Sequence, residues 1–177
     1  MESCLPCQAA QATTETEPLK PTEFPAGPWQ ELHADYKGPI GRDWYLHDLI
    51  DQYSKFPVVQ VVKSTSWEQL KQGLEEAFTT HERPERITTD GGPPYSGYEF
   101  GRYCQRMGVE HHTTTPEDAQ ANGFAEAFVK IMEKLVHTAL VEKQDPWKMV
   151  SSYLMAYRAT PHKVTGDGPA GLNTSWV

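Results

Sequence analysis

Long apolar runs are absent from the 177-residue sequence, because no stretch of about eighteen consecutive apolar residues occurs in it. The chain also opens without the charged and then apolar leader that is typical of a secretory signal. We therefore expect neither a membrane span nor export, and we place the protein in the nucleus or the cytoplasm. Three cysteines are too few, and odd in number, for a disulfide framework, which agrees with a reducing compartment.

Basic residues are scarce as well. The chain has 16 Lys and Arg against 24 Asp and Glu, which leaves a net charge of −8 at pH 7. Proteins that bind nucleic acid through charge normally cluster Lys and Arg, so the composition predicts weak binding of this kind for the chain alone. Hydrophobic residues make up 38% of the sequence, which is enough for the core of one globular domain.

Hydrophobic periodicity predicts an α/β architecture in which helices flank one mixed sheet. The first three strands follow one another with turns at Gly38-Pro39 and Tyr53-Ser54-Lys55, so they should form an antiparallel meander. The later strands alternate with helices and extend the sheet through crossovers. The expected strands are 31–38, 43–51, 57–63, 85–90 and 109–113, and the expected helices are 66–81, 97–107, 119–142 and 146–159.

Several conspicuous side chains fit a packed core or an ordinary surface better than a chemical role. Ser66 is expected to cap the first helix, and Cys104 lies in the apolar pattern of the second, where it should pack rather than react. His111 and His112 are neighbours on a strand, so their side chains alternate across it and seldom share one metal ion. The apolar stripe of the first helix comprises Trp67, Leu70, Leu74, Ala77 and Phe78.

Three acidic residues are expected on rigid elements. Asp35 lies on a strand whose alternation places His33 on the same face, and Asp90 ends a strand that breaks at Gly91. Glu126 lies on the polar face of the helix at 119–142. Carboxylates held in this way suit hard cations such as Mg²⁺ and Mn²⁺, although a chain with 24 acidic residues also produces such triples by chance. The apolar arc opposite Glu126 comprises Phe128, Ile131, Met132, Leu135 and Ala139.

Four segments and the stretch near the C-terminus carry a resemblance to a known family. They are PWQELHADYKGPI (28–40), YLHDLIDQYSKFP (45–57), ITTDGGPPYSGYEF (87–100) and QANGFAEAFVK (120–130), followed by AYRATPHKVTGDGPAGL. Together they resemble the catalytic core of the integrases of gypsy-type long-terminal-repeat retrotransposons and of retroviruses. The resemblance covers roughly residues 28–172, and the interval from Asp90 to Glu126 matches the retroviral spacing.

The resemblance implies a ribonuclease-H-like fold with a five-stranded mixed sheet flanked by helices. It implies that Asp35, Asp90 and Glu126 are both the catalytic and the metal-binding residues, that they hold two Mg²⁺ or Mn²⁺ ions, and that Asp35 bridges both. The implied activity is that of a polynucleotidyl transferase, which trims the 3′ ends of retroelement DNA and joins them to target DNA. The implied partners are DNA and at least one further copy of the chain, with no role for a membrane.

Four further residues are candidates for substrate binding. Tyr95 and Ser96 fall in the turn that follows the second aspartate, where a loop reaches the substrate backbone. Asn122 and Lys130 lie one helical turn on either side of Glu126. Lys130 is either an ion-pair partner of that glutamate or a contact to phosphate.

The sequence departs from the family's usual pattern at several positions. Gly91 stands where the family typically has Asn, and Phe124 and Ala127 replace polar residues of the long helix. None of these is a proposed metal ligand, so the departures affect substrate positioning rather than metal binding. His47 and Asp48 interrupt a strand that is normally apolar, so either this strand is locally solvated or the sequence has drifted.

The division of the chain into segments follows from the same resemblance. Residues 1–27 are interpreted as the remnant of a zinc-binding module and a flexible linker, residues 28–172 as the catalytic core, and residues 173–177 as a tail. Cys4 and Cys7 are only half of a zinc site, since a structural zinc ion needs four ligands.

Two other functions stay open from the sequence alone. A ribonuclease-H-like nuclease would share the fold and the metals. A domesticated or truncated fragment would fold, bind nucleic acid or protein, and catalyse nothing. The Gly-Pro-Pro turn after Asp90 and the AYRATPH segment favour the integrase over the nuclease, and the intact acidic triple opposes the inactive fragment.

The count of zinc ligands gives a first testable prediction. Elemental analysis of the purified chain should find no stoichiometric zinc, because Cys4 and Cys7 provide only half of the ligands. One tightly held zinc ion per chain would mean that other side chains complete the site, and it would contradict the linker assignment for residues 8–27.

Overall fold

A computed structural model describes residues 25–114, 123–161 and 166–173 of the chain. Five strands form one sheet in the order β3-β2-β1-β4-β5. Within the described ranges no helix is long and apolar enough to cross a membrane. The elements in chain order are β1 (Glu31–Ile40), β2 (Trp44–Asp51), β3 (Pro57–Val62), α2 (Trp67–His81), β4 (Arg86–Thr89), α3 (Tyr98–Met107), β5 (Glu110–Thr113), α4 (Gly123–Val141), α5 (Pro146–Ala159) and α6 (Pro169–Asn173).

The pairing of the strands confirms the predicted meander and crossovers. β1 pairs with β2 and β2 with β3 in antiparallel fashion, whereas β4 is parallel to both β1 and β5. β1 therefore lies in the middle of the sheet, and β2 and β4 form its two neighbours. Leu32 and His33 are paired on both sides, whereas β1 from Ala34 onward is paired only with β2.

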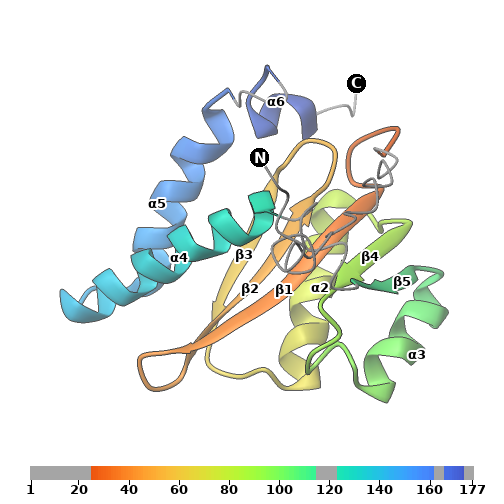
Figure 1. The fold of residues 1–177 in the computed structure, drawn as a ribbon, viewed down its shortest axis with the longest axis horizontal. Helices are drawn as coiled ribbons and strands as arrows, with labels where there is room; N and C mark the ends of the chain where they lie inside the picture. The colour runs from red at the N-terminus through yellow and green to blue at the C-terminus, as the bar shows by residue number, and fades with distance from the viewer. Residues whose placement is uncertain (1–24, 115–122, 162–165, 174–177) are drawn as a thin grey trace, which may run out of the picture.

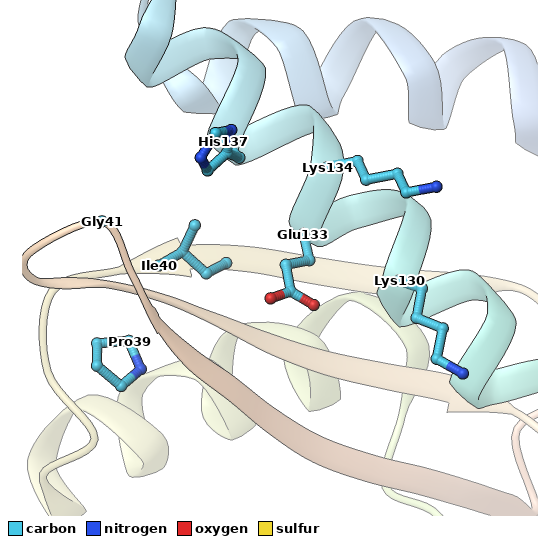
Figure 2. Close-up of a pocket in the computed structure, with 7 residues that line it drawn as sticks. All are labelled: Pro39, Ile40, Gly41, Lys130, Glu133, Lys134 and His137. Atoms are coloured by element: carbon cyan, nitrogen blue, oxygen red, sulfur yellow. The ribbon is translucent and has the colours of Figure 1, made fainter.

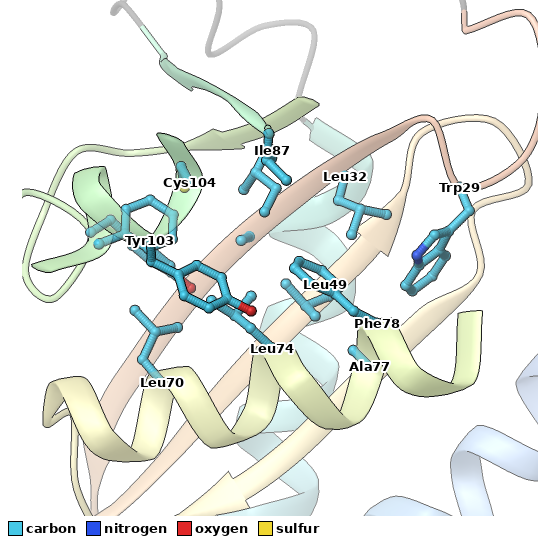
Figure 3. Packing of buried hydrophobic residues seen from close by; sticks show 14 of the residues in the cluster. Trp29, Leu32, Leu49, Leu70, Leu74, Ala77, Phe78, Ile87, Tyr103 and Cys104 are labelled. Atoms are coloured by element: carbon cyan, nitrogen blue, oxygen red, sulfur yellow. The ribbon is translucent and has the colours of Figure 1, made fainter. Parts of the chain in front are cut away.

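Helices cover both faces of the sheet, with α2 and α3 on one side and α4 and α5 on the other (Figure 1). Alternation along the strands gives each face its own apolar cluster. The cluster under α2 and α3, shown in Figure 3, includes Leu32, Ala34, Leu49, Leu70, Leu74, Phe78 and Ile87. The cluster under α4 and α5 includes Leu46, Ile50, Val59, Phe128, Met132, Val136 and Val150.

Local signals in the sequence set the helix ends. Ser66 accepts a hydrogen bond from the backbone N–H of Gln69 at 3.3 Å and so caps α2. Gly108 has a φ of 64°, the left-handed conformation that ends a helix such as α3. Pro146 lies in the first turn of α5, after a cap by Asp145. Cys104 is buried in the core, as predicted.

The structure corrects two predictions and adds one short helix. Gly38-Pro39 is not the turn between the first two strands, because β1 continues through an irregular pairing to Ile40, whose side chain is buried under α4. Ile131 is 40% exposed, so it lies outside the apolar arc of α4. The added helix, α6, ends at Asn173 and is not among the expected helices. Its five residues were too few to give a periodic signal.

One of the two explanations offered for His47 and Asp48 is that their strand is locally solvated. This explanation is wrong, because each residue is only 1% exposed. The His47 ring stacks on Tyr36 at 4.7 Å between ring centres, and its Nδ1 lies 3.1 Å from Oε1 of Gln60. The histidine is therefore accommodated by packing and one hydrogen bond. Asp48, in contrast, has no hydrogen-bond partner for its carboxylate among the described residues.

Asp51, at the end of β2, fixes the turn that leads into β3. Its fully buried carboxylate accepts hydrogen bonds from the backbone N–H of Trp29 at 3.0 Å and of Ser54 at 2.9 Å. The contact with Trp29 holds the start of the domain against the meander. A buried carboxylate with several donors is a structural anchor.

We expect replacement of Asp51 by Ala to lower the free energy of unfolding by about 3 kcal/mol, because buried N–H donors lose a charged acceptor. Urea denaturation measures this change. The matched control is Asp43→Ala, since Asp43 is exposed and forms only a 3.8 Å ion pair with the exposed Lys63. Equal stabilities of the two variants would show that the Asp51 bonds are not an anchor.

Candidate active site

Asp35 lies on the central strand and faces the layer of α4 and α5. Alternation places it on the face opposite Ala34, which is buried under α2 and α3. Its side chain is half-buried. Burial raises the pKa of Asp35, and the charges of Asp90 and Glu126 raise it further. Acidic residues from two other parts of the fold therefore influence one carboxylate.

Asp90 follows β4 directly and lies beside Asp35. The last pair of the parallel strands β1 and β4 is His33 with Thr88, and Asp35 and Asp90 each follow this pair by two residues. The Asp90 carboxylate is exposed and accepts a hydrogen bond from the backbone N–H of Gly92 at 2.8 Å. The turn thus holds the carboxylate at the rim of the sheet.

The turn after Asp90 explains the departure at Gly91. Gly91 has a φ of 74°, a left-handed conformation that Gly adopts freely and that Asn also tolerates. A Cβ at this position would lie 2.5 Å from Cγ2 of Thr113. Thr89 fixes the other side of the turn, because its Oγ1 accepts a hydrogen bond from the N–H of Gly91 at 3.2 Å. The Gly at this position therefore preserves the backbone path that places Asp90.

Glu126 lies in the first turn of α4 and is exposed. Ala125, Phe128 and Val129 bury the adjoining faces of the helix, so packing fixes the direction in which Glu126 projects. Phe124, the other departure in this helix, is half-buried and has the Lys55 ammonium 5.9 Å from its ring centre. The aromatic residue thus contributes packing where the family has a polar side chain.

The three carboxylates are neighbours but do not form a closed ligand cage. In the part of the chain that the structure describes, no group of three or more His, Cys, Asp and Glu side chains is arranged to hold a metal ion. Like charges repel, so carboxylates without a cation between them are expected to stand apart. The donor set itself, three carboxylates on a strand, a turn and a helix, fits a hard divalent cation.

Sequence reasoning gave no role to two residues next to the triad. His33 lies two residues before Asp35 on the same face and is 8% exposed. Burial lowers the pKa of His33 to about 4, although the charge of Asp90 opposes the shift. Burial also lowers the pKa of Lys55, whose charge acts on His33. Alternation could have placed His33 in the site, whereas nothing in the sequence links Lys55 to it.

The predicted substrate-binding residues fall into three groups. Tyr95 is 2% exposed and packs against Tyr36 and Phe100, so its side chain anchors the turn and has no face for DNA, contrary to the prediction. Ser96, next to it, is exposed. Asn122 lies outside the described residues, as do Cys4 and Cys7.

Lys130 is exposed and lines a shallow pocket of about 490 Å³ between α4 and the hairpin of β1 and β2 (Figure 2). The pocket begins one helical turn beyond Glu126 and also includes Lys134 and His137. Figure 2 shows Glu133 pointing from α4 toward β1. The pocket therefore adjoins Glu126 along the helix, and its two lysines add positive charge beside Glu133.

Comparisons with known proteins agree with this geometry. The family described as integrase core domain matches residues 25–119. An uncharacterized protein of Caenorhabditis elegans is 32% identical over 168 residues, which are 94% of this chain and 13% of that protein. The Gag-Pro-Pol polyprotein of sheep pulmonary adenomatosis virus is 30% identical over 105 residues, or 59% of this chain and 6% of the polyprotein. The chain thus spans a small part of these relatives.

A solved structure supports the fold. The catalytic core domain of HTLV-2 integrase, in complex with magnesium and in a trimeric form, superposes with a TM-score of 0.69 at 18% identity. The match covers 84% of this chain and 98% of that domain. It confirms the predicted ribonuclease-H-like fold, with its five-stranded mixed sheet and flanking helices.

The raised pKa of Asp35 predicts how its removal changes stability with pH. An acid whose pKa is higher in the folded state destabilises that state once pH rises above the ordinary Asp pKa, and it does not do so at lower pH. Without divalent cations, Asp35→Asn should therefore be more stable than the original chain at about pH 7, and this gain should vanish near about pH 3.

Urea denaturation in the presence of a chelator measures the stability difference between the two chains at each pH. Asp43→Asn, at an exposed residue, serves as the control. A variant that is less stable than the original chain at neutral pH would contradict the electrostatic account of the site.

Proposed function

The chain belongs to the integrase core domain family, and from this we propose that it is the catalytic domain of a retroelement integrase. In this proposal it trims the 3′ ends of element DNA and transfers them to target DNA. The observation that carries the proposal is the proximity of three carboxylates on three elements: Asp90 follows the strand paired with that of Asp35, and Glu126 in the first turn of α4 lies near enough for its charge to act on Asp35.

Asp35, Asp90 and Glu126 would hold the divalent cations, Mg²⁺ or Mn²⁺. When bound, two such ions activate the attacking oxygen and neutralise charge on the leaving oxygen of a phosphodiester. The chain's own contribution is to keep the three carboxylates on rigid elements. The Gly92 N–H holds the Asp90 carboxylate, and packing of α4 directs Glu126.

The attacking group decides the outcome of the reaction. Water as the nucleophile forms a new bond to phosphorus, breaks the bond to the 3′ oxygen and leaves a trimmed end. A DNA 3′-hydroxyl that attacks target DNA in the same way joins the two molecules. One set of carboxylates serves both steps, because each step is an in-line displacement at phosphorus.

Lys130 and Lys134 are the cations best placed to contact phosphate. Both are exposed on α4, at one and two helical turns beyond Glu126, and both line the pocket of Figure 2. The structure gives no ion pair between Lys130 and Glu126 among its described residues, which favours the phosphate contact of the two alternatives. Ser96 supplies an exposed hydroxyl in the turn after Asp90.

Self-association is part of the proposal. Trp147 and Met155 of α5 are 47% and 71% exposed, which leaves apolar surface for a second copy. The trimeric form of the HTLV-2 core domain supports association of this fold. DNA as the substrate places the protein in the nucleus or in a cytoplasmic retroelement particle.

A non-catalytic interaction domain is the second candidate, and the net charge of −8 favours it, since a DNA enzyme normally carries a basic surface. The same charge predicts that this chain binds duplex DNA weakly without a cation. An assay that demands little DNA affinity therefore separates the two candidates best.

Strand transfer on a pre-assembled branched DNA in Mn²⁺ provides this assay. Glu126→Gln keeps the shape of the side chain but removes the charge that holds a cation, so activity should fall by at least roughly 100-fold, more than the loss of an outer partner of a metal ligand. The variant should also lose the rise in melting temperature that Mn²⁺ gives the original chain.

The control is Glu142→Gln, the same change at an exposed residue just past the end of α4, which should keep both properties. If the original chain shows no more activity than Glu126→Gln and no stabilisation by Mn²⁺, the catalytic proposal fails and the interaction domain remains.

A further inference from the structure

Asp48 is a buried carboxylate without a hydrogen-bond partner. It lies in the middle of β2 and is 1% exposed. Neither of its carboxylate oxygens has a partner among the described residues. Buried carboxylates are normally paired or hydrogen-bonded, because the charge loses its hydration. An orphaned one calls for an explanation.

Asp51 shows how the same strand satisfies a buried aspartate that serves the fold. It lies three residues further along and accepts hydrogen bonds from Trp29 and Ser54. Within the part of the chain that the structure describes, the Asp48 carboxylate accepts no hydrogen bond, although both aspartates are almost completely buried. A purely structural role therefore does not account for Asp48.

The sheet register places Asp48 against Asp35. The two residues are direct partners in the antiparallel pairing of β1 and β2, so their side chains lie on the same face, about 4.5–5.5 Å apart at Cβ. The partner of Asp48 on the other side, in β3, is the apolar Val59. Of its two direct partners in the sheet, Asp35 is thus the polar one.

Electrostatics agree with this placement. Burial raises the pKa of Asp48 well above its ordinary range, and the charge of Asp35 is the further cause of the shift. A divalent cation at Asp35 would reverse that influence, because it turns the neighbourhood of Asp48 from negative to positive.

We propose that Asp48 is a fourth carboxylate of the cation site, a positioning residue that acts through Asp35 from the adjacent strand. This inference rests on the proposed function, since it requires a cation at Asp35. The charge of Asp48 strengthens the attraction of the site for a divalent cation and restrains the side chain of Asp35 beside it. The strand is normally apolar in the family pattern, so Asp48 is a departure from it.

The test compares cation affinity in four forms of the chain by calorimetric titration with Mg²⁺ and with Mn²⁺. They are the original chain, Asp48→Asn, Asp48→Val and Asp43→Asn. Asn keeps the shape of Asp without its charge, and Val restores an apolar residue to the strand. Asp43→Asn removes one acidic charge from an exposed turn, so it controls for net charge.

We expect both Asp48 variants to bind the cations about 10-fold more weakly, the effect typical of a residue behind a metal ligand. Both should also melt at a higher temperature than the original chain when no cation is present, because the change removes a buried, unpartnered acid from beside Asp35. Asp43→Asn should match the original chain in affinity to within about twofold, since it is an exposed charge.

Three results would overturn the inference. If both Asp48 variants bind cations as tightly as the original chain, Asp48 is only an unfavourable buried acid, and the proposed function stands without it. If neither variant folds, the residue serves the fold. If the original chain itself binds no cation, the proposed function fails first and the inference falls with it.

Discussion

Carboxylates that repel one another lie together on one face of the sheet. Asp35 lies on the central strand β1. Asp48 lies opposite it on β2, and Asp90 lies just beyond the end of β4. Glu126 adds a further negative charge from the helix above them. Such an arrangement is unfavourable in the absence of a counter-charge, so other interactions must hold it in place.

The stabilising interactions lie on both sides of the site. Two apolar clusters clamp the sheet between pairs of helices, and the bonds of Asp51 tie the start of the domain to the meander. Tyr95 packs into the core and anchors the turn that carries Asp90. The stability of the surrounding fold thus holds like charges close together, and in the proposed function a bound cation would offset their repulsion. Such a trade of stability for function is common at active sites.

The sequence predicted most elements because their signals are local. Alternation and capping residues located the strands and helices, and strand alternation put Asp35 and His33 on one face. Prediction from the sequence failed where tertiary packing determines the end of a strand or the surroundings of a side chain. β1 runs past Gly38-Pro39 because Ile40 finds a buried place under α4. Asp48 looked like a sign of solvation or drift, and only the register of β1 and β2 shows that it meets Asp35.

We propose that these carboxylates form one cation site. Anomalous diffraction from crystals of the chain soaked in Mn²⁺ is a direct measurement of that site. The account predicts an anomalous peak beside the carboxylates of Asp35 and Asp90, with the Glu126 side chain turned toward it, and no such peak in crystals of Asp35→Asn. A well-ordered site without a peak in the original chain, or manganese bound only at other acidic residues, would contradict it.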